Sequence, residues 1–244
     1  MIETRQLETL AEFQDAVRLQ QDIWGFEAIE LLPVRLFVVA SKIGGHAFGA
    51  YDGPRMVGFC LAIPGIKAGG RSYLHSHMLG VTGEYRDRGV GRMLKLAQRR
   101  EALSRGVALI EWTFDPLEIK NAFFNLERLG AVVRRYVLNQ YGITSSALHG
   151  GLPTDRCVAE WWIASPRADA ISADRHFPRP PVEARLEVPA GIDRLRGENP
   201  ARAREIQKSI SDRFLEYFSR GLAVVGFERS DQAGAYLFGP WESK

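Results

Sequence analysis

The 244-residue sequence contains little cysteine, and this scarcity limits both disulfides and metal sites. Its two cysteines, Cys60 and Cys157, lie in apolar stretches outside any CxxC or Cys/His spacing. Isolated cysteines of this kind are typical of reduced core residues in a cytosolic protein, with a disulfide as the alternative. We therefore expect two buried thiols and no bound metal.

The sequence also lacks a strong excess of charge and any long apolar run. Its net charge of +3 is too small to indicate binding to nucleic acid or to a membrane, although a local basic site for an anion remains open. No apolar run approaches the roughly 20 residues of a membrane-spanning helix, and no secretory signal opens the chain. With 45% hydrophobic residues the chain can bury a sizeable core, so we expect a soluble, cytoplasmic protein.

Apolar periodicity and turn residues predict alternating helices and strands over the first 140 residues. Helices are expected over 7–24, 34–42, 89–105 and 115–129, the last with Asp115 as its N-cap. Strands are expected over 46–51, 56–63, 73–81, 107–114 and 132–138. This order is typical of an α/β or α+β fold built on a mixed sheet.

The last third of the sequence is less regular. We expect a strand over 157–163, a proline-rich linker over 165–185, a helix over 200–220 capped by Asn199, and a closing hairpin at 222–227 and 235–238. The length of the chain fits one large domain, or a domain of about 150 residues plus a smaller one.

A glycine-rich turn between the strand expected at 73–81 and the helix expected at 89–105 carries the clearest chemistry. Its sequence is Arg86-Asp87-Arg88-Gly89-Val90-Gly91-Arg92. The first N–H groups of a helix have no intrahelical partner and lie at the positive end of the helix dipole. The two glycines leave a phosphate room to reach those N–H groups, and the three arginines add positive charge. Two interpretations stay open, an anion-binding turn or glycines used for tight packing alone. Neither the three-glycine Rossmann spacing nor the end of a P-loop is present.

Residues 81–94 resemble motif A of the GNAT superfamily of N-acetyltransferases, whose pattern is Gln or Arg, two residues, Gly, one residue, then Gly or Ala. The expected element order over about residues 1–140 is similar to that of the superfamily, and the segment through residue 142 resembles a branch with a C-terminal extension. The resemblance implies a GNAT-like mixed, mostly antiparallel central sheet flanked by helices. It also implies an acyl-CoA-binding domain over 1–145 and an α/β extension over 146–244 that packs on or extends the sheet.

The resemblance further implies acetyl-CoA as the co-substrate and assigns its contacts. Backbone groups of Leu79, Gly80 and Val81 would bind the pantetheine arm, and Asn121 lies on the helix that completes the CoA groove. Phosphate contacts would come from Arg86, Asp87, Arg88, Gly89, Val90, Gly91 and Arg92.

Two residues on the expected strands are candidates for proton transfer. With strict alternation, His75 and His77 share a face with Leu79 and Val81, and His75 falls where some members of the family carry a carboxylate base. A histidine suits this role because its ordinary pKa is about 6.5; a buried structural histidine is the alternative. Glu111 interrupts an apolar strand, so it is either functional or, as we favour, part of an ion pair.

The sequence departs from the family at the usual general acid, a tyrosine four residues before the glycine that ends the 115–129 helix. Counting back from Gly130 gives Leu126, and this helix contains no tyrosine. Tyr136 and Tyr141 are the nearest alternatives. Packing is the favoured role for Tyr136, which leaves the loop residue Tyr141 as the candidate acid; water could also protonate the thiolate.

These observations favour an acetyl-CoA-dependent N-acyltransferase that acts on a small amine or amino-acid-like acceptor by direct transfer in a ternary complex. A non-catalytic acyl-CoA sensor of the same fold and a protein acetyltransferase stay open as alternatives. We expect a small-molecule acceptor as the partner, no nucleic acid and no membrane, and a homodimer as the assembly common for this fold.

Overall fold

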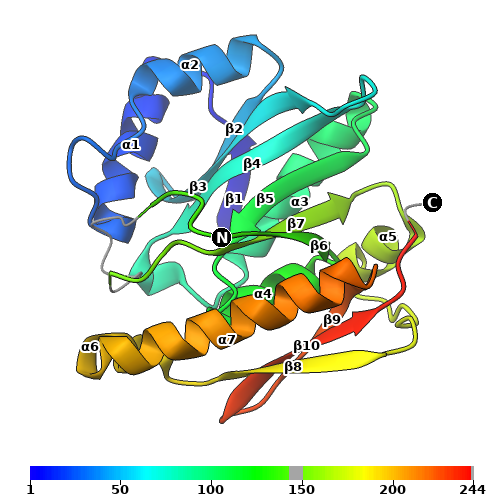
Figure 1. The fold of residues 1–244 in the computed structure, drawn as a ribbon. Coiled ribbons are helices and arrows are strands. Elements are labelled where there is room, and N and C mark those ends of the chain that lie inside the picture. The colour runs from blue at the N-terminus through cyan, green and yellow to red at the C-terminus, as the bar shows by residue number, and fades with distance from the viewer. Residues whose placement is uncertain (143–150, 243–244) are drawn as a thin grey trace. The chain divides into compact units, whose positions relative to one another are not determined.

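The computed structural model describes residues 1–142 and 151–242, and the chain forms two compact units, Met1–Glu111 and Trp112–Lys244 (Figure 1). The division falls inside strand β5, Leu109–Phe114. The boundary expected between residues 145 and 146 lies outside the described residues. None of the helices in the described part of the chain is long and apolar enough to cross a bilayer.

Unit 1 is built on a sheet with the strand order β1-β2-β3-β4-β5. Its other strands are β1 Ile2–Gln6, β2 His46–Asp52, β3 Arg55–Ile66 and β4 Ser72–Val81. Strands β1 to β4 pair antiparallel in sequence, while β4 and β5 pair in parallel. The expected mixed, mostly antiparallel sheet flanked by helices is therefore confirmed.

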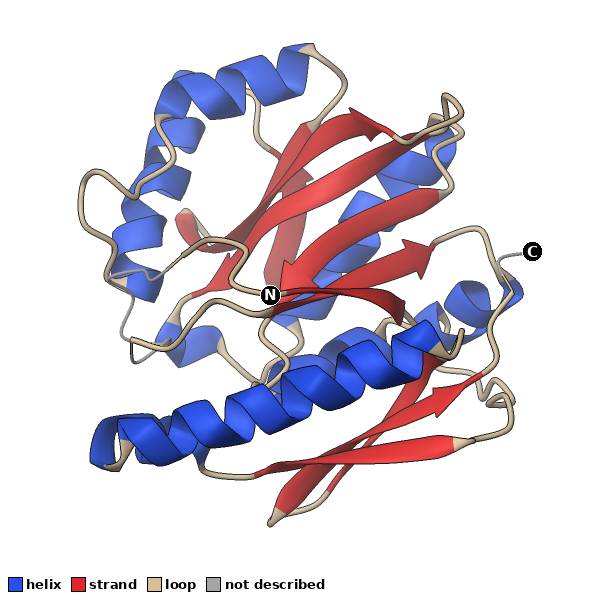
Figure 2. Ribbon diagram, viewed as in Figure 1, coloured by secondary structure: helices blue, strands red, loops and turns tan. Residues whose placement is uncertain are grey.

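Three helices cover the two faces of the sheet in unit 1 (Figure 2). Helices α1 (Leu10–Trp24) and α2 (Val34–Lys42) pack on one face through a core that includes Phe13, Phe37 and Phe59. Helix α3 (Val90–Ser104) packs on the other face through Val90 and Leu94. The strand β4 therefore has α1 and α2 on one side and α3 on the other.

Strand β1 was not expected, and helix α1 begins at Leu10 rather than at residue 7. Thr9 caps α1: its Oγ1 accepts from the Glu12 N–H at 3.3 Å, and the Glu12 carboxylate accepts from the Thr9 N–H at 2.9 Å. This capping box starts the helix at Leu10 and leaves residues 2–6 to pair with β2.

A β-bulge interrupts β4 and changes which residues share a face. Leu61 of β3 pairs with Met78, and the next pair joins Ala62 to Ser76, which leaves His77 as the extra residue. Leu79 and Val81 pack on the α3 side, and so does Ser76, whose hydroxyl bonds Gln98 of α3 at 3.0 Å. The side chain of His75 alternates with that of Ser76 and so lies on the opposite face. The expectation that His75 and His77 share a face with Leu79 and Val81 is wrong, because strict alternation assumes an unbroken ladder.

Unit 2 contains an antiparallel sheet with the strand order β7-β6-β9-β10-β8. Its strands are β6 Val132–Val137, β7 Arg156–Trp162, β8 Ala184–Pro189, β9 Ala223–Arg229 and β10 Ala233–Gly239. Helix α7, Pro200–Ser219, packs on it through Phe214, whose ring stacks on Tyr136 with centroids 4.8 Å apart. The expected Asn199 cap and the closing hairpin β9–β10 are confirmed.

Four elements of unit 2 differ from the expectation. The expected linker contains a helix, α5 (Pro166–Ser172), because Ser165 caps it. Strand β8 and helix α6 (Ile192–Glu198) were not expected. The expected 115–129 helix is shorter: Asp115 caps only a turn, and α4 (Ile119–Phe123) runs into a π-helical turn, Phe124–Arg128.

Candidate functional site

The glycine-rich turn joins β4 to α3 through backbone conformations that few residues adopt. After β4 ends at Val81, a 3-10 turn covers Gly83–Tyr85, and Asp87 and Gly89 then have φ angles of 59° and 79°. Both lie in the left-handed region, which glycine adopts without penalty and aspartate tolerates. Gly89 is the N-cap residue, so its conformation sets the point at which α3 begins.

The N-terminus of α3 has the features of an anion site. Its first intrahelical bond runs from the Met93 N–H to the Gly89 carbonyl at 3.0 Å, so the N–H groups of Val90 and Gly91 have no acceptor within the helix. No side chain caps this end, and the first turn holds no acidic residue. A Cβ at Gly89 would meet no atom within 4 Å, so the space beside the turn is open. N–H groups that the helix leaves without an acceptor, the helix dipole and the open space beside Gly89 together suit a phosphate.

Two arginines of the turn already contact other groups. The Arg86 guanidinium donates to the carbonyls of Val81 at 3.3 Å and Ile23 at 3.5 Å, so it ties the turn to the end of β4. The Arg88 guanidinium lies 5.3 Å from the centre of the Tyr85 ring. The phosphate contacts expected from these side chains stay predictions, as do those from Asp87 and Arg92.

The residues expected to hold the pantetheine arm lie at the end of β4. The side chains of Leu79 and Val81 pack against the cluster on the α3 side. Gly80 faces α1, where a Cβ would come within 2.6 Å of the Trp24 ring. Position 80, between Leu79 and Val81, is therefore restricted to glycine because α1 approaches the strand closely there.

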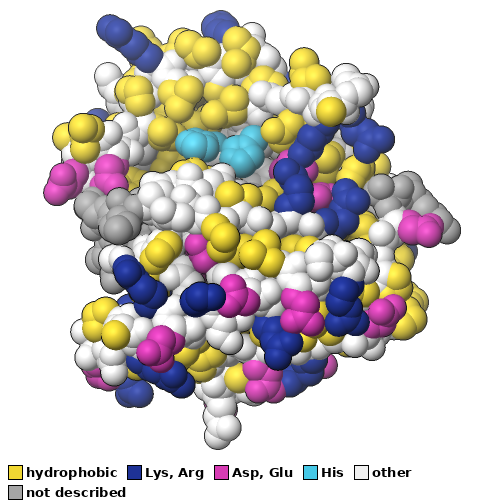
Figure 3. All heavy atoms as spheres, in the orientation of Figure 1, with side chains coloured by type: hydrophobic (Ala, Val, Ile, Leu, Met, Phe, Trp, Pro, Cys, Tyr) yellow, Lys and Arg dark blue, Asp and Glu magenta, His cyan; other side chains and the backbone are white. Residues whose placement is uncertain are grey.

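His75 and His77 lie together on β4, with ring centroids 5.9 Å apart. Figure 3 shows histidine side chains at the molecular surface with hydrophobic side chains around them. The pKa of His75 is lowered to about 4, mainly by burial and also by the neighbouring His77. The Glu111 carboxylate acts in the opposite direction. The His75 ring is therefore neutral near pH 7 and able to accept a proton.

Glu111 forms the ion pair that the sequence favoured. Its buried Oε2 lies 2.5 Å from the Lys67 Nζ, which also lies 4.6 Å from the centre of the Tyr73 ring. Glu111 pairs across the sheet with His75. A buried carboxylate needs such a partner, and the ion pair expected for Glu111 is present. A catalytic role for Glu111 stays a prediction.

The remaining candidates belong to unit 2. The half-exposed Tyr141 has its hydroxyl 3.0 Å from Thr113 Oγ1 and accepts from Gln140 Nε2 at 3.2 Å. Tyr136 stacks on Phe214, which confirms its packing role. Asn121 is exposed, and its Oδ1 accepts from Asn125 Nδ2 at 3.2 Å.

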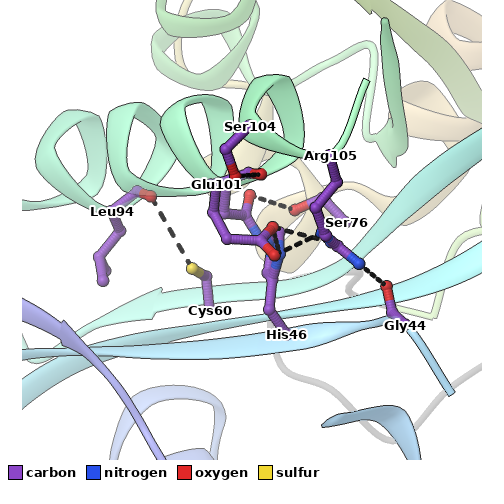
Figure 4. Close-up of polar contacts among 9 residues, drawn as sticks. Gly44, His46, Cys60, Ser76, Leu94, Glu101, Ser104 and Arg105 are labelled. Carbon is purple, nitrogen blue, oxygen red and sulfur yellow. Dashed lines mark hydrogen bonds and ion pairs between the residues drawn. The ribbon is translucent and has the colours of Figure 1, made fainter. Parts of the chain in front are cut away.

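A buried polar network beneath β4 was missed by the sequence reasoning. Lys95 of α3 is only 2% exposed, and its Nζ donates to the Ser76 hydroxyl at 2.7 Å, which in turn bonds Gln98. Further along the same helix, Glu101 lies between His46 of β2, at 2.5 Å, and Arg105 (Figure 4). The helical spacing could have indicated their burial, because Lys95 and Gln98 flank the apolar stripe of α3.

No cluster of three or more His, Cys, Asp or Glu side chains among the described residues is arranged to hold a metal ion. No family model and no curated protein matches the sequence. Solved structures do match, and three of them illustrate the likeness.

A protein assigned to the GNAT family from Desulfovibrio desulfuricans has a TM-score of 0.53 at 14% identity, covering 67% of this chain and 100% of that one. The ribosomal-protein-S18-alanine N-acetyltransferase from Escherichia coli has a TM-score of 0.53 at 19% identity, covering 68% and 96%. Aminoglycoside 6'-acetyltransferase type Ii has a TM-score of 0.53 at 19% identity, covering 67% and 98%. The chain therefore has the fold of the GNAT acetyltransferases, as the resemblance implied.

Proposed function

We propose that this chain is an acetyl-CoA-dependent acyltransferase whose α3 N-terminus binds the CoA pyrophosphate. The observation that carries the proposal is the turn itself: left-handed Asp87 and Gly89 lead into a helix end with no side-chain cap and no acidic residue in its first turn. The fold supports it, because the structural neighbours are acetyltransferases. A cytoplasmic localisation and a homodimer stay predictions.

The acceptor we propose is a small amine or an amino-acid-like molecule. One neighbour is named for an aminoglycoside, which is a small amine, and another is named for the alanine of ribosomal protein S18. A protein acceptor is therefore the alternative within the same chemistry.

Direct transfer needs a neutral amine and a proton for the leaving thiolate. The amine nitrogen attacks the thioester carbonyl, the C–S bond breaks and the amide forms. We assign to His75 the proton lost by the amine, because its ring is neutral at pH 7 and has an unprotonated nitrogen, although the lowered pKa of about 4 makes it a weaker base than an ordinary histidine. We assign to the Tyr141 hydroxyl the proton gained by the CoA thiolate.

A non-catalytic acyl-CoA sensor is the second candidate function. One observation favours it: the π-helical turn Phe124–Arg128 contains no tyrosine, and Leu126 within it is fully buried. A sensor would bind CoA at the same turn and release no thiol.

The test measures free thiol released from acetyl-CoA with a panel of amines and amino acids, alongside the thermal shift caused by CoA. We expect a CoA-dependent shift and turnover on at least one acceptor. The variant His75→Gln should keep the shift and lower kcat about 100-fold, because it removes only proton transfer. A shift without turnover on any acceptor would favour the sensor. No shift with CoA would contradict both functions.

A further inference from the structure

Tyr141 lies in an exposed loop, yet its backbone is held by a neighbouring segment. The Tyr141 N–H donates to Thr154 Oγ1 at 2.8 Å, and that hydroxyl donates to the Gly142 carbonyl at 2.8 Å. The Gln140 N–H donates to the Thr154 carbonyl at 3.0 Å, and the Thr154 N–H donates to Asn139 Oδ1 at 3.2 Å. Thr154 is buried, so solvent does not compete for these four bonds, which hold residues 139–142 to Thr154.

Asp155 joins this loop to helix α7. Its Oδ1 accepts from the Asn139 N–H at 2.8 Å, and its Oδ2 accepts from Ser211 Oγ of α7 at 2.6 Å. Ser211 Oγ also lies 2.8 Å from the Gln207 carbonyl, but its single hydrogen is better used by the carboxylate, the stronger acceptor. Asp155 and Ser211 are both buried, so solvent does not compete for this bond.

Helix α7 makes a second contact with the same segment one turn earlier. Gln207 Nε2 donates to the Pro153 carbonyl at 2.7 Å. The Tyr136 hydroxyl lies 2.9 Å from Ser211 Oγ, which links the end of β6 to the same point on α7. Two side chains of α7 thus hold residues 153–155, and these residues hold Tyr141.

The Tyr141 hydroxyl itself has defined neighbours. It accepts from Gln140 Nε2 and lies 3.0 Å from Thr113 Oγ1, while the Arg156 guanidinium lies 5.5 Å from the ring centre. A side chain that is 47% exposed but fixed at both its backbone and its hydroxyl is oriented rather than mobile.

We propose that Thr154, Asp155 and Ser211 are positioning residues for Tyr141, and that supporting this tyrosine is a task of the C-terminal segment through α7. The proposal rests on the proposed function, in which the Tyr141 hydroxyl protonates the CoA thiolate. It assigns no contact with substrate to Asp155 or Ser211, which act only through the loop.

The test compares kcat and KM for acetyl-CoA in the full chain and in the variants Tyr141→Phe, Asp155→Asn and Ser211→Ala. Ser209→Ala is the matched control, because Ser209 is exposed on the same helix. We expect Asp155→Asn and Ser211→Ala to lower kcat about tenfold to 100-fold with KM nearly unchanged, since misplacing a catalytic group slows chemistry without weakening CoA binding. Ser209→Ala should match the unsubstituted chain.

The decisive readout is the double variant Tyr141→Phe with Ser211→Ala. If Ser211 acts through Tyr141, the double variant should be no slower than Tyr141→Phe alone. An equal further loss of kcat in the Tyr141→Phe background would overturn the proposal, because it would indicate a general structural role. Should Ser211→Ala fail to fold, Asp155→Asn combined with Tyr141→Phe gives the same comparison.

The outcomes separate this proposal from the function on which it rests. If Tyr141→Phe slows turnover but Asp155→Asn and Ser211→Ala leave it unchanged, the positioning role alone is overturned. Turnover unaffected by Tyr141→Phe would overturn the role of Tyr141 and the positioning role with it, while leaving the acyltransferase in place. Absence of turnover in the unsubstituted chain would overturn both.

Discussion

The pKa of Lys95 shows how strongly the ionisation of a side chain depends on its surroundings. Its ammonium lies beneath β4, and burial lowers the pKa of Lys95 from its ordinary value to about 7, although the Cys60 thiol acts in the opposite direction. The imidazole of His75 on β4 also interacts electrostatically with Lys95. The Ser76 hydroxyl, at 2.7 Å, offers only a neutral partner.

We predict that Lys95→Met stabilises the chain in a pH-dependent way. Between pH 7 and about 10.5 the unfolded chain binds a proton at Lys95 that the folded chain does not, so stability rises with pH across this window. The cost of burying the ammonium is largest below pH 7, where the variant should gain up to about 5 kcal/mol, less the lost hydrogen bond to Ser76. Urea unfolding at pH 6 and pH 9.5 measures the difference in the free energy of unfolding between Lys95→Met and the unsubstituted chain.

The control for this prediction is Lys42→Met on α2, where the lysine is exposed. Its free energy of unfolding should differ little from that of the unsubstituted chain at either pH. A gain for Lys95→Met that stays the same from pH 6 to pH 9.5 would show that ionisation is not its cause.

At the residue scale, the sequence predicted what depends on near neighbours and missed what depends on register. Gly89 and the buried Cys60 could be recognised from their local context, and the carboxylate of Glu111 required a partner wherever it was buried. The face of His75 could not be predicted, because a bulge at His77 leaves no mark in the alternation. The burial of Lys95 was not predicted, because its partner Ser76 comes from a different element.

The N-terminus of α3 is the element on which the proposed function depends, and Gly89 tests it. We predict that Gly89→Ala lowers the free energy of unfolding by about 1 kcal/mol, because alanine is strained at a φ of 79°. The same change moves the N–H groups that would meet the phosphate, so CoA affinity should fall at least about tenfold. A CoA titration followed by thermal shift measures both effects.

Gly53 provides a matched control in the turn between β2 and β3. It also has a positive φ, 56°, and a Cβ there would also meet nothing within 4 Å. Gly53→Ala should therefore cost similar stability and leave CoA affinity unchanged. Equal affinity in Gly89→Ala and Gly53→Ala would argue against the assigned phosphate site.

At the element scale, long amphipathic helices and apolar strands were predictable, and short edge elements were not. Strand β1 exists because β2 offers it an open edge, a property of the sheet rather than of residues 2–6. The capping box of Thr9 and Glu12 was visible in the sequence and would have placed the start of α1. Helix α5 was hidden by the prolines around it, although Ser165 followed by Pro166 is a good helix start.

Across the whole molecule, each compact unit contains one buried thiol, Cys60 in unit 1 and Cys157 in unit 2. Burial raises the pKa of Cys60 to about 12 and raises the pKa of Cys157 well above its ordinary value. Neither thiol should react with an aromatic disulfide reagent in the folded chain, because both access and thiolate are lacking.

We predict that both thiols become reactive only on unfolding and that a reducing agent leaves the Tm unchanged. The single variants Cys60→Ala and Cys157→Ala make each remaining thiol a reporter for one unit, so labelling across a urea gradient gives a midpoint for each. Rapid labelling of either thiol without urea would contradict the burial, and a Tm that falls with the reductant would indicate a disulfide.

The order of strands in unit 2 has a consequence for how the chain is made. Strand β8 pairs with β10, and β6 pairs with β9 on one of its edges, so both depend on residues 223–239, which follow them in the sequence. During synthesis these edges have no partner until β9 and β10 leave the ribosome, whereas β1 to β4 of unit 1 pair with their neighbours in sequence. An unpaired edge invites pairing with other chains. A nascent or truncated chain lacking β9 and β10 is thus the form of this protein most exposed to aggregation, and the one on which a chaperone has most to act.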